Sequence, residues 1–500
     1  MKKILFTHSY FLRFDPKQWK MKQPYPPLAT LYAAAFVRNA GYRVTVFDNM
    51  FSESARQIEK ALLEEKPDVL VIYDDGFNYL TKMCLTNMRD AAFEMIHLAK
   101  TKGIKVIVSS SDSTDQSEKY LNAGADYILA GEGEQTLLDV IDMLESGETK
   151  WDTIPGLIRR TEKGIEKNAK REVLKNLDSL PHPAWDLINV DNYKNIWLNH
   201  HGYFSLNVST TRGCPFHCNW CAKPIYGNRY NVHSPEWVTE EISFLVNTYG
   251  ASHLWMTDDI FGLKPGWINQ FALLVQNKKI KFNFKIQSRV DLLLEDENIA
   301  ALARAGCETI WVGAESGSQK VLDAMDKGTK VEQIHLATRL MKKNGIKPAF
   351  FLQFGYPGES EADIQLTIDM VKELLPDDIG ISVSYPLPGT KFYENVKADL
   401  KEKSNWTDSD ELAMMFDNTY PSFFYKQLQR YVHRVYRTKQ GISEIKNLFS
   451  NPVQISFRQL KRIAAIPVHA TGTILYKQQL SKWKRDAVHK ASELSSIKTD

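Results

Sequence analysis

The chain is poor in cysteine and has no long apolar segment. It contains 5 cysteines among 500 residues, too few for a disulfide framework and typical of a reducing compartment. No stretch approaches the roughly 18 apolar residues of a membrane-spanning helix. The N-terminus reaches His8 and Ser9 before the apolar core of a signal peptide could form. These absences predict a cytoplasmic protein, and the length predicts two or three domains.

The charge is unevenly distributed along the chain. The formal net charge is +3, but residues 426–500 carry 15 Lys and Arg against 4 Asp and Glu, and the other residues carry a net −8. Within residues 401–500, Tyr420–Arg437, Phe457–Ile466 and Ile474–Arg485 are typical of basic amphipathic helices. Such helices either lie on an anionic membrane surface or cap a domain with a solvated basic face. No nucleic-acid-binding module accompanies the charge, so no nucleic-acid partner is expected.

Residues 1–148 alternate between short apolar segments and helical patterns. Gly or Pro follows the predicted helices, as expected at helix ends. This alternation predicts a Rossmann-type sheet with flavodoxin-like order. The predicted strands are Lys3–Phe6, Arg43–Phe47, Val69–Tyr73, Lys105–Ser109 and Tyr127–Ala130, and the predicted helices are Leu28–Asn39, Ser54–Glu65 and Thr86–Lys102.

Ligands of such sheets bind beyond the carboxyl ends of the strands. The segment from Gly131 to Glu134 follows a strand and opens a helix, so it either approaches a ligand or is simply a tight turn. It is no dinucleotide fingerprint, because G-x-G-x-x-G is absent after the first strand. The candidate lining residues at the strand ends are His8, Ser9, Ser110, Ser111, Gly131, Glu132 and Gly133.

Residues 149–203 break the alternation and predict a linker. A small hairpin is expected with its turn at Glu162–Gly164, followed by a proline-stiffened connector around Pro181 and Pro183. A domain boundary is therefore expected within this segment.

Three of the five cysteines lie within eight positions, at Cys214, Cys218 and Cys221. Three thiolates on one short loop cannot complete a tetrahedral zinc site without a fourth ligand. They can hold three irons of a [4Fe–4S] cluster and leave the fourth iron open to a small molecule. The spacing C-x3-C-x2-C therefore indicates chemistry at an open iron.

Residues 204–400 show six or seven repeats of strand then helix, which predicts a full or partial (β/α) barrel. The cysteine loop follows the first strand, Leu206–Ser209. Since reactive groups gather at strand carboxyl ends in such barrels, further site residues are expected after later strands.

The cysteine spacing, with Trp220 before the last cysteine, resembles the radical S-adenosylmethionine superfamily. Together with the flavodoxin-like domain, the layout over residues 1–400 resembles its cobalamin-binding branch, which includes methyltransferases and the anaerobic magnesium-protoporphyrin ester cyclase type. The resemblance implies a cluster on the three cysteines, with S-adenosylmethionine on its open iron and reductive cleavage to a 5′-deoxyadenosyl radical. It also implies S-adenosylmethionine contacts from Trp220, Asp258, Asp259, Gln287, Arg289, Glu315, Ser316 and Tyr356.

Structural alternatives stand beside these roles. Asp258 and Asp259 follow a strand and could instead cap the next helix, and Glu315 could pair with Arg289 in the barrel floor. Cys307 and Cys84 are expected to be packing residues.

Cobalamin is implied by the resemblance, but the D-x-H-x-x-G motif that supplies a cobalt-binding histidine is absent. Bound cobalamin would therefore have no protein histidine on cobalt. Alternatively, the Rossmann-type domain serves only in substrate binding or assembly.

The leading prediction is cobalamin-dependent methyl transfer to an unactivated carbon of a small-molecule or lipid-like substrate. Radical oxidation, cyclisation or rearrangement is the alternative, followed by a non-catalytic cluster-binding protein. A transfer-RNA methylthiotransferase is disfavoured, because no second cluster and no RNA-binding module is evident. An electron donor such as flavodoxin or ferredoxin is expected. The C-terminal region is expected to cap the barrel, with peripheral membrane contact as the alternative.

Overall fold

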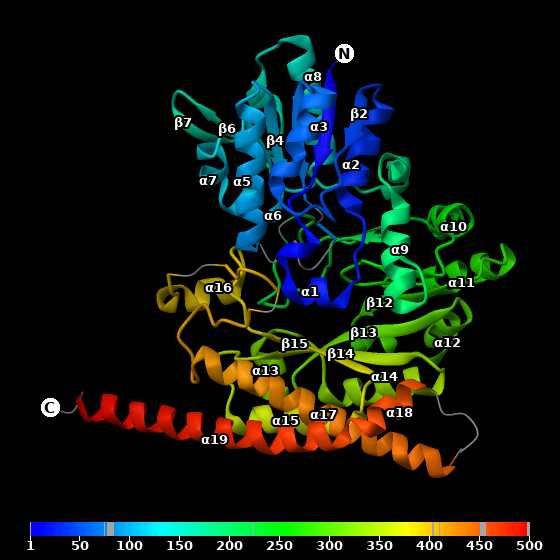
Figure 1. Cartoon of the computed structure of the whole chain (residues 1–500), viewed down its shortest axis with the longest axis vertical. Helices are drawn as coiled ribbons and strands as arrows, with labels where there is room; N and C mark the ends of the chain where they lie inside the picture. Colours follow the sequence, from blue (N-terminus) through cyan, green and yellow to red (C-terminus); the bar gives the residue numbers. More distant parts are fainter. Residues whose placement is uncertain are drawn as a thin grey trace.

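A mainly parallel N-terminal sheet, a parallel barrel sheet and a C-terminal helical layer make up the fold (Figure 1). This computed structural model describes residues 2–74, 76–77, 85–223, 225–402, 405–409, 411–450 and 457–497. Cys84 lies outside the described residues. The predicted fold class is confirmed: a Rossmann-type domain precedes a partial (β/α) barrel, and helices end the chain.

The N-terminal sheet has seven strands in the order β2-β1-β3-β4-β5-β6-β7. The first five are parallel in the flavodoxin-like order. Helices cover both faces, which is why a strand such as β3 is buried along its whole length. The strands are β1 (Lys3–Thr7), β2 (Arg43–Val46), β3 (Val69–Tyr73), β4 (Lys105–Ser109) and β5 (Tyr127–Leu129); the helices are α1 (Pro16–Met21), α2 (Leu28–Asn39), α3 (Ile58–Glu65), α5 (Thr86–Lys100), α6 (Ser111–Asp115), α7 (Ser117–Asn122) and α8 (Glu134–Ser146).

The hairpin expected around Glu162 is present and extends this sheet. Strands β6 (Leu157–Thr161) and β7 (Gly164–Lys167) pair antiparallel, and β6 pairs with β5. The chain then passes through short helical turns to α9 (Val190–His201), which leads into the second sheet.

The second sheet has six parallel strands in the order β15-β14-β13-β12-β11-β8. The order along the chain matches the order in space, as in a partial (β/α) barrel. The strands are β8 (Ser205–Val208), β11 (His253–Met256), β12 (Asn283–Ser288), β13 (Cys307–Glu315), β14 (Lys347–Phe354) and β15 (Asp378–Val383); the helices are α10 (Pro235–Phe244), α11 (Trp267–Asn277), α12 (Asp296–Arg304), α13 (Gln319–Ala324), α14 (Val331–Lys343) and α15 (Glu361–Leu374).

The C-terminal region is helical and packs against the barrel. After α16 (Lys391–Val396), the long helices α17 (Ser422–Ser450) and α19 (Ile466–Ile497) lie side by side, with α18 (Phe457–Ala464) between them in sequence (Figure 1). Tyr436 of α17 donates a hydrogen bond to the carbonyl of Pro376. None of the helices within the described residues has the length and apolar character needed to cross a membrane.

Candidate functional site

The three clustered cysteines lie on a loop at the carboxyl end of β8. The loop leaves and returns through a two-stranded ribbon of β9 (Thr211–Arg212) and β10 (Asn231–Val232). Cys214 is buried, and Cys218 and Cys221 are half-buried. All three are free thiols, and burial raises the pKa of Cys214 and raises that of Cys221 to about 12.

The donor set of this loop fits a cluster better than a single ion. Within the described ranges, no three His, Cys, Asp or Glu side chains are grouped so that they could hold one metal ion. In a [4Fe–4S] cluster each thiolate binds its own iron, so the three sulfurs need not converge on one point.

Arg289 contacts the cysteine loop from the third barrel strand. Its Nη1 lies 3.7 Å from the Cys218 sulfur, and its guanidinium lies 3.8 Å from the centre of the Phe216 ring. Asp291 accepts hydrogen bonds from Nε and Nη2, at 3.0 and 3.1 Å. The loop is therefore held beside a buried, oriented positive charge.

Glu315 pairs with Lys327 and not with Arg289, so the alternative of a Glu315–Arg289 ion pair in the barrel floor is wrong. Lys327 Nζ lies 2.8 Å from Glu315 Oε1, and both side chains are buried. Although burial alone would lower it, the charges of Glu315 and Cys218 raise the pKa of Lys327.

The backbone at Glu315 explains how this carboxylate reaches the site. Its φ is +56°, which non-glycine residues seldom adopt, and the pairing register shifts between Gly313 and Glu315. Such a bulge redirects a side chain at the end of a strand. Lys327 lies in the loop after α13, where the sequence carries no signal for it.

Trp220 belongs to the same cluster of side chains. Its ring centre lies 5.8 Å from Lys327 Nζ. Its Nε1 is buried with no hydrogen-bond partner among the residues described. A buried donor without a partner is costly, so this atom fits a site that receives a ligand.

Asp258 supports the chain just before the cysteine loop. Its Oδ1 accepts hydrogen bonds from the backbone N–H groups of Thr210 and Thr211, both at 2.7 Å, and its Oδ2 accepts one from the Thr210 hydroxyl at 2.6 Å. Burial raises the pKa of Asp258 to about 7. Neighbouring Asp259 is exposed, and its charge contributes to raising the pKa of Cys214 and Cys221.

The remaining barrel candidates lie at the same edge of the sheet. The Tyr356 hydroxyl donates a hydrogen bond to Asn219 Oδ1 at 2.9 Å. Asn219 lies between Cys218 and Trp220 in the sequence, so Tyr356 holds the cysteine loop. The Ser316 hydroxyl lies 3.0 Å from that of Thr367. Gln287 is half-buried, and its carbonyl accepts a hydrogen bond from Phe261.

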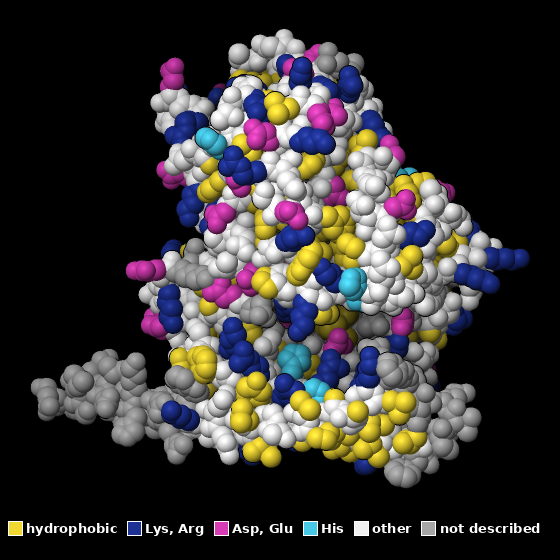
Figure 2. All heavy atoms as spheres, in the orientation of Figure 1, with side chains coloured by type: hydrophobic (Ala, Val, Ile, Leu, Met, Phe, Trp, Pro, Cys, Tyr) yellow, Lys and Arg dark blue, Asp and Glu magenta, His cyan; other side chains and the backbone are white. Residues whose placement is uncertain are grey.

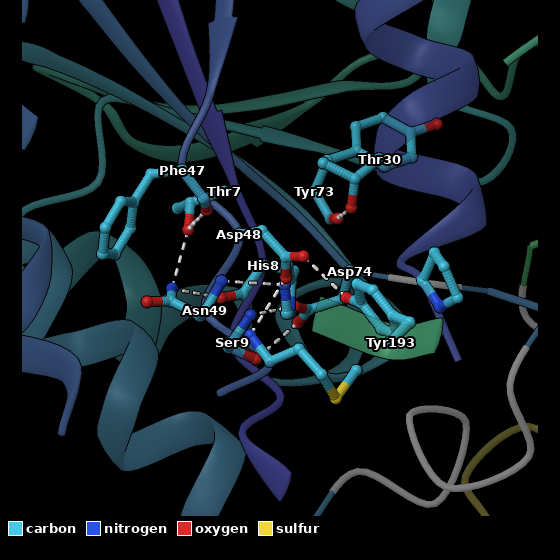
Figure 3. Close-up of polar contacts among 12 residues, drawn as sticks. Thr7, His8, Ser9, Thr30, Phe47, Asp48, Asn49, Tyr73, Asp74 and Tyr193 are labelled. Atoms are coloured by element: carbon cyan, nitrogen blue, oxygen red, sulfur yellow. Dashed lines mark hydrogen bonds and ion pairs between the residues drawn. The ribbon is translucent and has the colours of Figure 1, made fainter. Parts of the chain in front are cut away.

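At the carboxyl edge of the N-terminal sheet, His8 and Ser9 are tied into polar networks (Figure 3). His8 Nε2 lies 2.9 Å from Asp48 Oδ1, and Tyr193 donates to the other oxygen of Asp48 at 2.6 Å. Burial alone would raise the pKa of Asp48, but the hydrogen bond with His8 lowers it. Ser9 donates to both oxygens of Asp74, at 2.7 and 2.9 Å.

Ser110 and Ser111 open α6 at the end of β4. The Ser110 hydroxyl accepts a hydrogen bond from the backbone N–H of Ser113 and so caps this helix. Ser111 is the first residue of the helix and is buried. Both residues therefore lie at the strand end where the sequence placed them.

The turn before α8 binds the cysteine loop. Arg212 forms ion pairs with Glu132 and with Glu134, the latter at 2.7 Å. The other oxygen of Glu132 accepts a hydrogen bond from the backbone of Leu174 at 2.6 Å. Glu132, a candidate ligand contact, thus links the two sheets, and no sequence pattern indicated Arg212 as its partner.

Small residues leave room for close approach at this edge. A Cβ added at Gly76 would lie 2.4 Å from Ile225 Cδ1, and one at Gly131 would lie 3.6 Å from the Ile225 carbonyl oxygen. A Cβ at Gly133 would lie 2.8 Å from the Tyr73 hydroxyl. Ile225 of the cysteine loop and Tyr73 therefore fill the space beside these glycines, and the absence of a Cβ lets the loop pack directly against the strand ends.

Comparison with known families gives two matches. Residues 208–371 match the radical SAM superfamily, and residues 20–141 match the B12-binding domain. The first match includes the cysteine loop, and the second ends within α8, after the turn that holds Glu132.

Two curated proteins are similar to this chain over most of its length. The chain is 28% identical to an uncharacterized methyltransferase of Pyrococcus horikoshii, over 76% of this chain and 81% of that protein. It is 24% identical to the anaerobic magnesium-protoporphyrin IX monomethyl ester cyclase of Rubrivivax gelatinosus, over 79% and 70%.

Two solved structures share the fold. The cobalamin-dependent S-adenosylmethionine radical enzyme OxsB, with aqua-cobalamin and S-adenosylmethionine bound, matches with a TM-score of 0.75 at 16% identity, over 100% of this chain and 75% of that one. The methyltransferase TsrM from Kitasatospora setae matches with a TM-score of 0.66 at 19% identity, over 80% and 76%.

Proposed function

Because this chain is an enzyme that combines a radical SAM domain with a B12-binding domain, we propose that it transfers a methyl group to an unactivated carbon. The acceptor is a small-molecule or lipid-like substrate. The methyl group replaces a hydrogen atom of the substrate. It would come from one molecule of S-adenosylmethionine, which leaves as S-adenosylhomocysteine. The hydrogen would leave in the 5′-deoxyadenosine of a second molecule, cleaved to methionine with electrons from the electron donor.

The two domains imply three cofactors: a [4Fe–4S] cluster, S-adenosylmethionine and cobalamin. Together these supply reductive cleavage of S-adenosylmethionine and a methyl carrier. Cys214, Cys218 and Cys221 would hold the cluster. Trp220, Asp259, Arg289 and Glu315 would face S-adenosylmethionine, and the strand ends at Ser9, Ser110 and Gly131 would face cobalamin.

The observation that carries the proposal is the contact between the cysteine loop and the carboxyl edge of the N-terminal sheet. Arg212 lies two residues before Cys214 and pairs with Glu132 and Glu134. Ile225, four residues after Cys221, approaches Gly76 and Gly131. This contact supports the proposal, because a cluster held by the cysteine loop and a corrin held at the strand ends would lie next to each other, as methyl transfer through both requires.

The test is anaerobic reconstitution with iron, sulfide and cobalamin, followed by reduction in the presence of S-adenosylmethionine. Methyl transfer predicts S-adenosylhomocysteine beside 5′-deoxyadenosine, and Cys218→Ala should abolish 5′-deoxyadenosine. Cys307→Ala is the matched control, because Cys307 is a buried thiol at the start of β13, outside the loop. Formation of 5′-deoxyadenosine without S-adenosylhomocysteine would favour radical oxidation, cyclisation or rearrangement instead.

Two partners belong to the proposal. Reductive cleavage needs an electron donor such as flavodoxin or ferredoxin.

The C-terminal helices are proposed to contact an anionic membrane surface. Val468, Ile474 and Leu475 are 63%, 62% and 51% exposed on α19, and Lys477 and Lys482 lie on the same helix. Figure 2 shows hydrophobic side chains along the lower edge of the molecule, where α17 and α19 lie, with Lys and Arg side chains beside them.

A further inference from the structure

The two faces of the barrel sheet differ in what covers them. Side chains alternate between the faces of a strand. Phe284, Ile310 and Phe350 are fully buried within the main hydrophobic core. Their neighbours Lys285, Trp311 and Phe351 point to the opposite, inner face and are only partly buried or exposed.

Aromatic side chains form part of this inner face. Phe351 is 37% exposed although β14 is paired on both sides, with β13 and with β15. Its ring stacks on that of Trp311 with centroids 4.7 Å apart and planes at 28°. Gly380 on β15 adds no side chain beside them, and a Cβ there would lie 3.4 Å from both rings. Trp311 and Phe351 therefore offer an aromatic surface in the middle of the sheet.

Lys285 lies on the same face, two residues further from the carboxyl end of the sheet than the position of Trp311. Lys285 is in register with Trp255 on one neighbouring strand and with Thr309 on the other. Trp311 is two residues further along β13 than Thr309, so its Cα lies roughly 7 Å along the strand and 5 Å across from that of Lys285. The lysine and the aromatic surface are thus within reach of one small molecule.

The Lys285 ammonium has aromatic neighbours in place of a carboxylate. Its Nζ lies 5.2 Å from the centre of the Tyr25 ring and 5.0 Å from that of Trp255, within cation–π distance. Over the described part of the chain, no Asp or Glu oxygen lies within ion-pair distance of it. Burial lowers its pKa to about 8. A partly desolvated cation without a counter-ion is costly, and an anionic group would remove that cost.

We propose that this inner face binds the substrate, and that the substrate is a flat unsaturated ring system with a carboxylate. The ring system lies on Trp311 and Phe351, and the carboxylate pairs with Lys285. A single ammonium matches the single charge of a carboxylate better than the charge of a phosphate, about −1.5 to −2. The inference rests on the proposed function, in which the cofactors lie at the cysteine loop. The strand of Lys285 runs toward that loop through Gln287 and Arg289.

The test measures binding to the anaerobically reconstituted full chain with pyrene-1-carboxylate as the probe and pyrene-1-carboxamide as its uncharged analogue. The carboxylate should bind at least about tenfold more tightly than the carboxamide. Lys285→Met should remove that difference by weakening only the carboxylate, whereas Lys285→Arg should retain most of it. Phe351→Leu should weaken both probes by a similar factor.

The matched control is Lys281→Met, an exposed lysine just before the same strand, which should leave both affinities unchanged. Equal binding of the two probes would overturn the proposal, as would equal losses in Lys285→Arg and Lys285→Met. Because the readout is binding, such a result would leave methyl transfer standing. Conversely, absence of S-adenosylhomocysteine would overturn the methyl-transfer proposal and leave the probe result intact.

Discussion

Arg212 and Glu132 join the two halves of the site through a buried ion pair. Their side chains are 3% and 8% exposed, and Glu134 completes the arrangement. The Arg212 guanidinium also lies between 5.2 and 5.6 Å from the rings of Tyr226, Tyr32 and Phe77. One side chain thus fixes the start of the cysteine loop against the turn before α8.

Arg212→Met should destabilise the protein strongly, because it leaves two buried carboxylates without their partner. Removing one member of a buried pair typically costs about 3–5 kcal/mol. Thermal unfolding and retained cobalamin after gel filtration measure the effect. The control is Arg13→Met, whose pair with Glu53 is largely exposed, with side chains 45% and 67% accessible. Equal unfolding midpoints for the two variants would refute the interdomain role.

Tyr356→Phe should loosen the cysteine loop without unfolding the barrel. The lost hydroxyl lies 2.9 Å from Asn219 Oδ1 and 3.0 Å from the Ala324 carbonyl, and such a bond contributes about 1 kcal/mol. We expect faster loss of iron to a chelator from the reconstituted variant. Tyr127→Phe is the control, because among the described residues the Tyr127 hydroxyl has no hydrogen-bond partner. The role fails if both variants lose iron at the wild-type rate.

Arg289→Gln should lower the reduction potential of the cluster. A positive charge 3.7 Å from the Cys218 sulfur favours the more negative, reduced state. Its removal should shift the potential downward by roughly 60 mV or more, a factor of ten for one electron. A redox titration followed by electron paramagnetic resonance, without S-adenosylmethionine, measures this shift. Arg304→Gln, an exposed arginine ending α12, should change nothing; an unchanged potential in Arg289→Gln would exclude the electrostatic role.

The double variant Ile474→Asp/Leu475→Asp should weaken membrane contact. Wild-type protein should co-sediment with vesicles containing phosphatidylglycerol, less so at high salt, and not with pure phosphatidylcholine. The variant replaces exposed apolar side chains with charges that anionic lipid repels. Leu273→Asp on α11 is matched, because Leu273 is 56% exposed. Equal binding to both kinds of vesicle, or equal losses in variant and control, would contradict the proposed membrane contact.

Local patterns in the sequence predicted the elements well. Val69–Tyr73 and Lys105–Ser109 are strands with the predicted bounds, because parallel strands buried over most or all of their length are mainly apolar segments. Leu28–Asn39 is likewise a helix with the predicted bounds. The position of the cysteine loop after the first barrel strand could also be predicted, because the spacing of its three cysteines is a local pattern of eight residues.

Partners far apart in sequence were beyond such patterns. Lys327 pairs with Glu315 through a bulge, and Arg212 pairs with Glu132 across 80 positions. Neither pairing has a periodicity or spacing that the sequence could reveal. The same holds for Lys285, which only the alternation of a correctly registered strand places on the inner face.

Glu359 should make the stability of the barrel depend on pH. This carboxyl is 3% exposed; Oε2 accepts a hydrogen bond from Gly355 at 2.7 Å, and Oε1 has no partner among the described residues. Burial raises its pKa from 4.5 to about 8. Between those values the folded state holds a proton that the unfolded state has lost. The free energy of unfolding should therefore fall with rising pH, by about 1.4 kcal/mol per unit.

Glu359→Gln removes this contribution to the pH dependence of the free energy of unfolding, because glutamine does not titrate. At about pH 5 the variant and wild type should unfold at similar temperatures, whereas at about pH 8 the variant should unfold at the higher temperature. Glu332→Gln, at an exposed position on α14, should follow wild type at both values. A midpoint difference between Glu359→Gln and wild type that stays constant from pH 5 to pH 8 would mean that Glu359 is ionised throughout, with its charge solvated or paired in the folded protein.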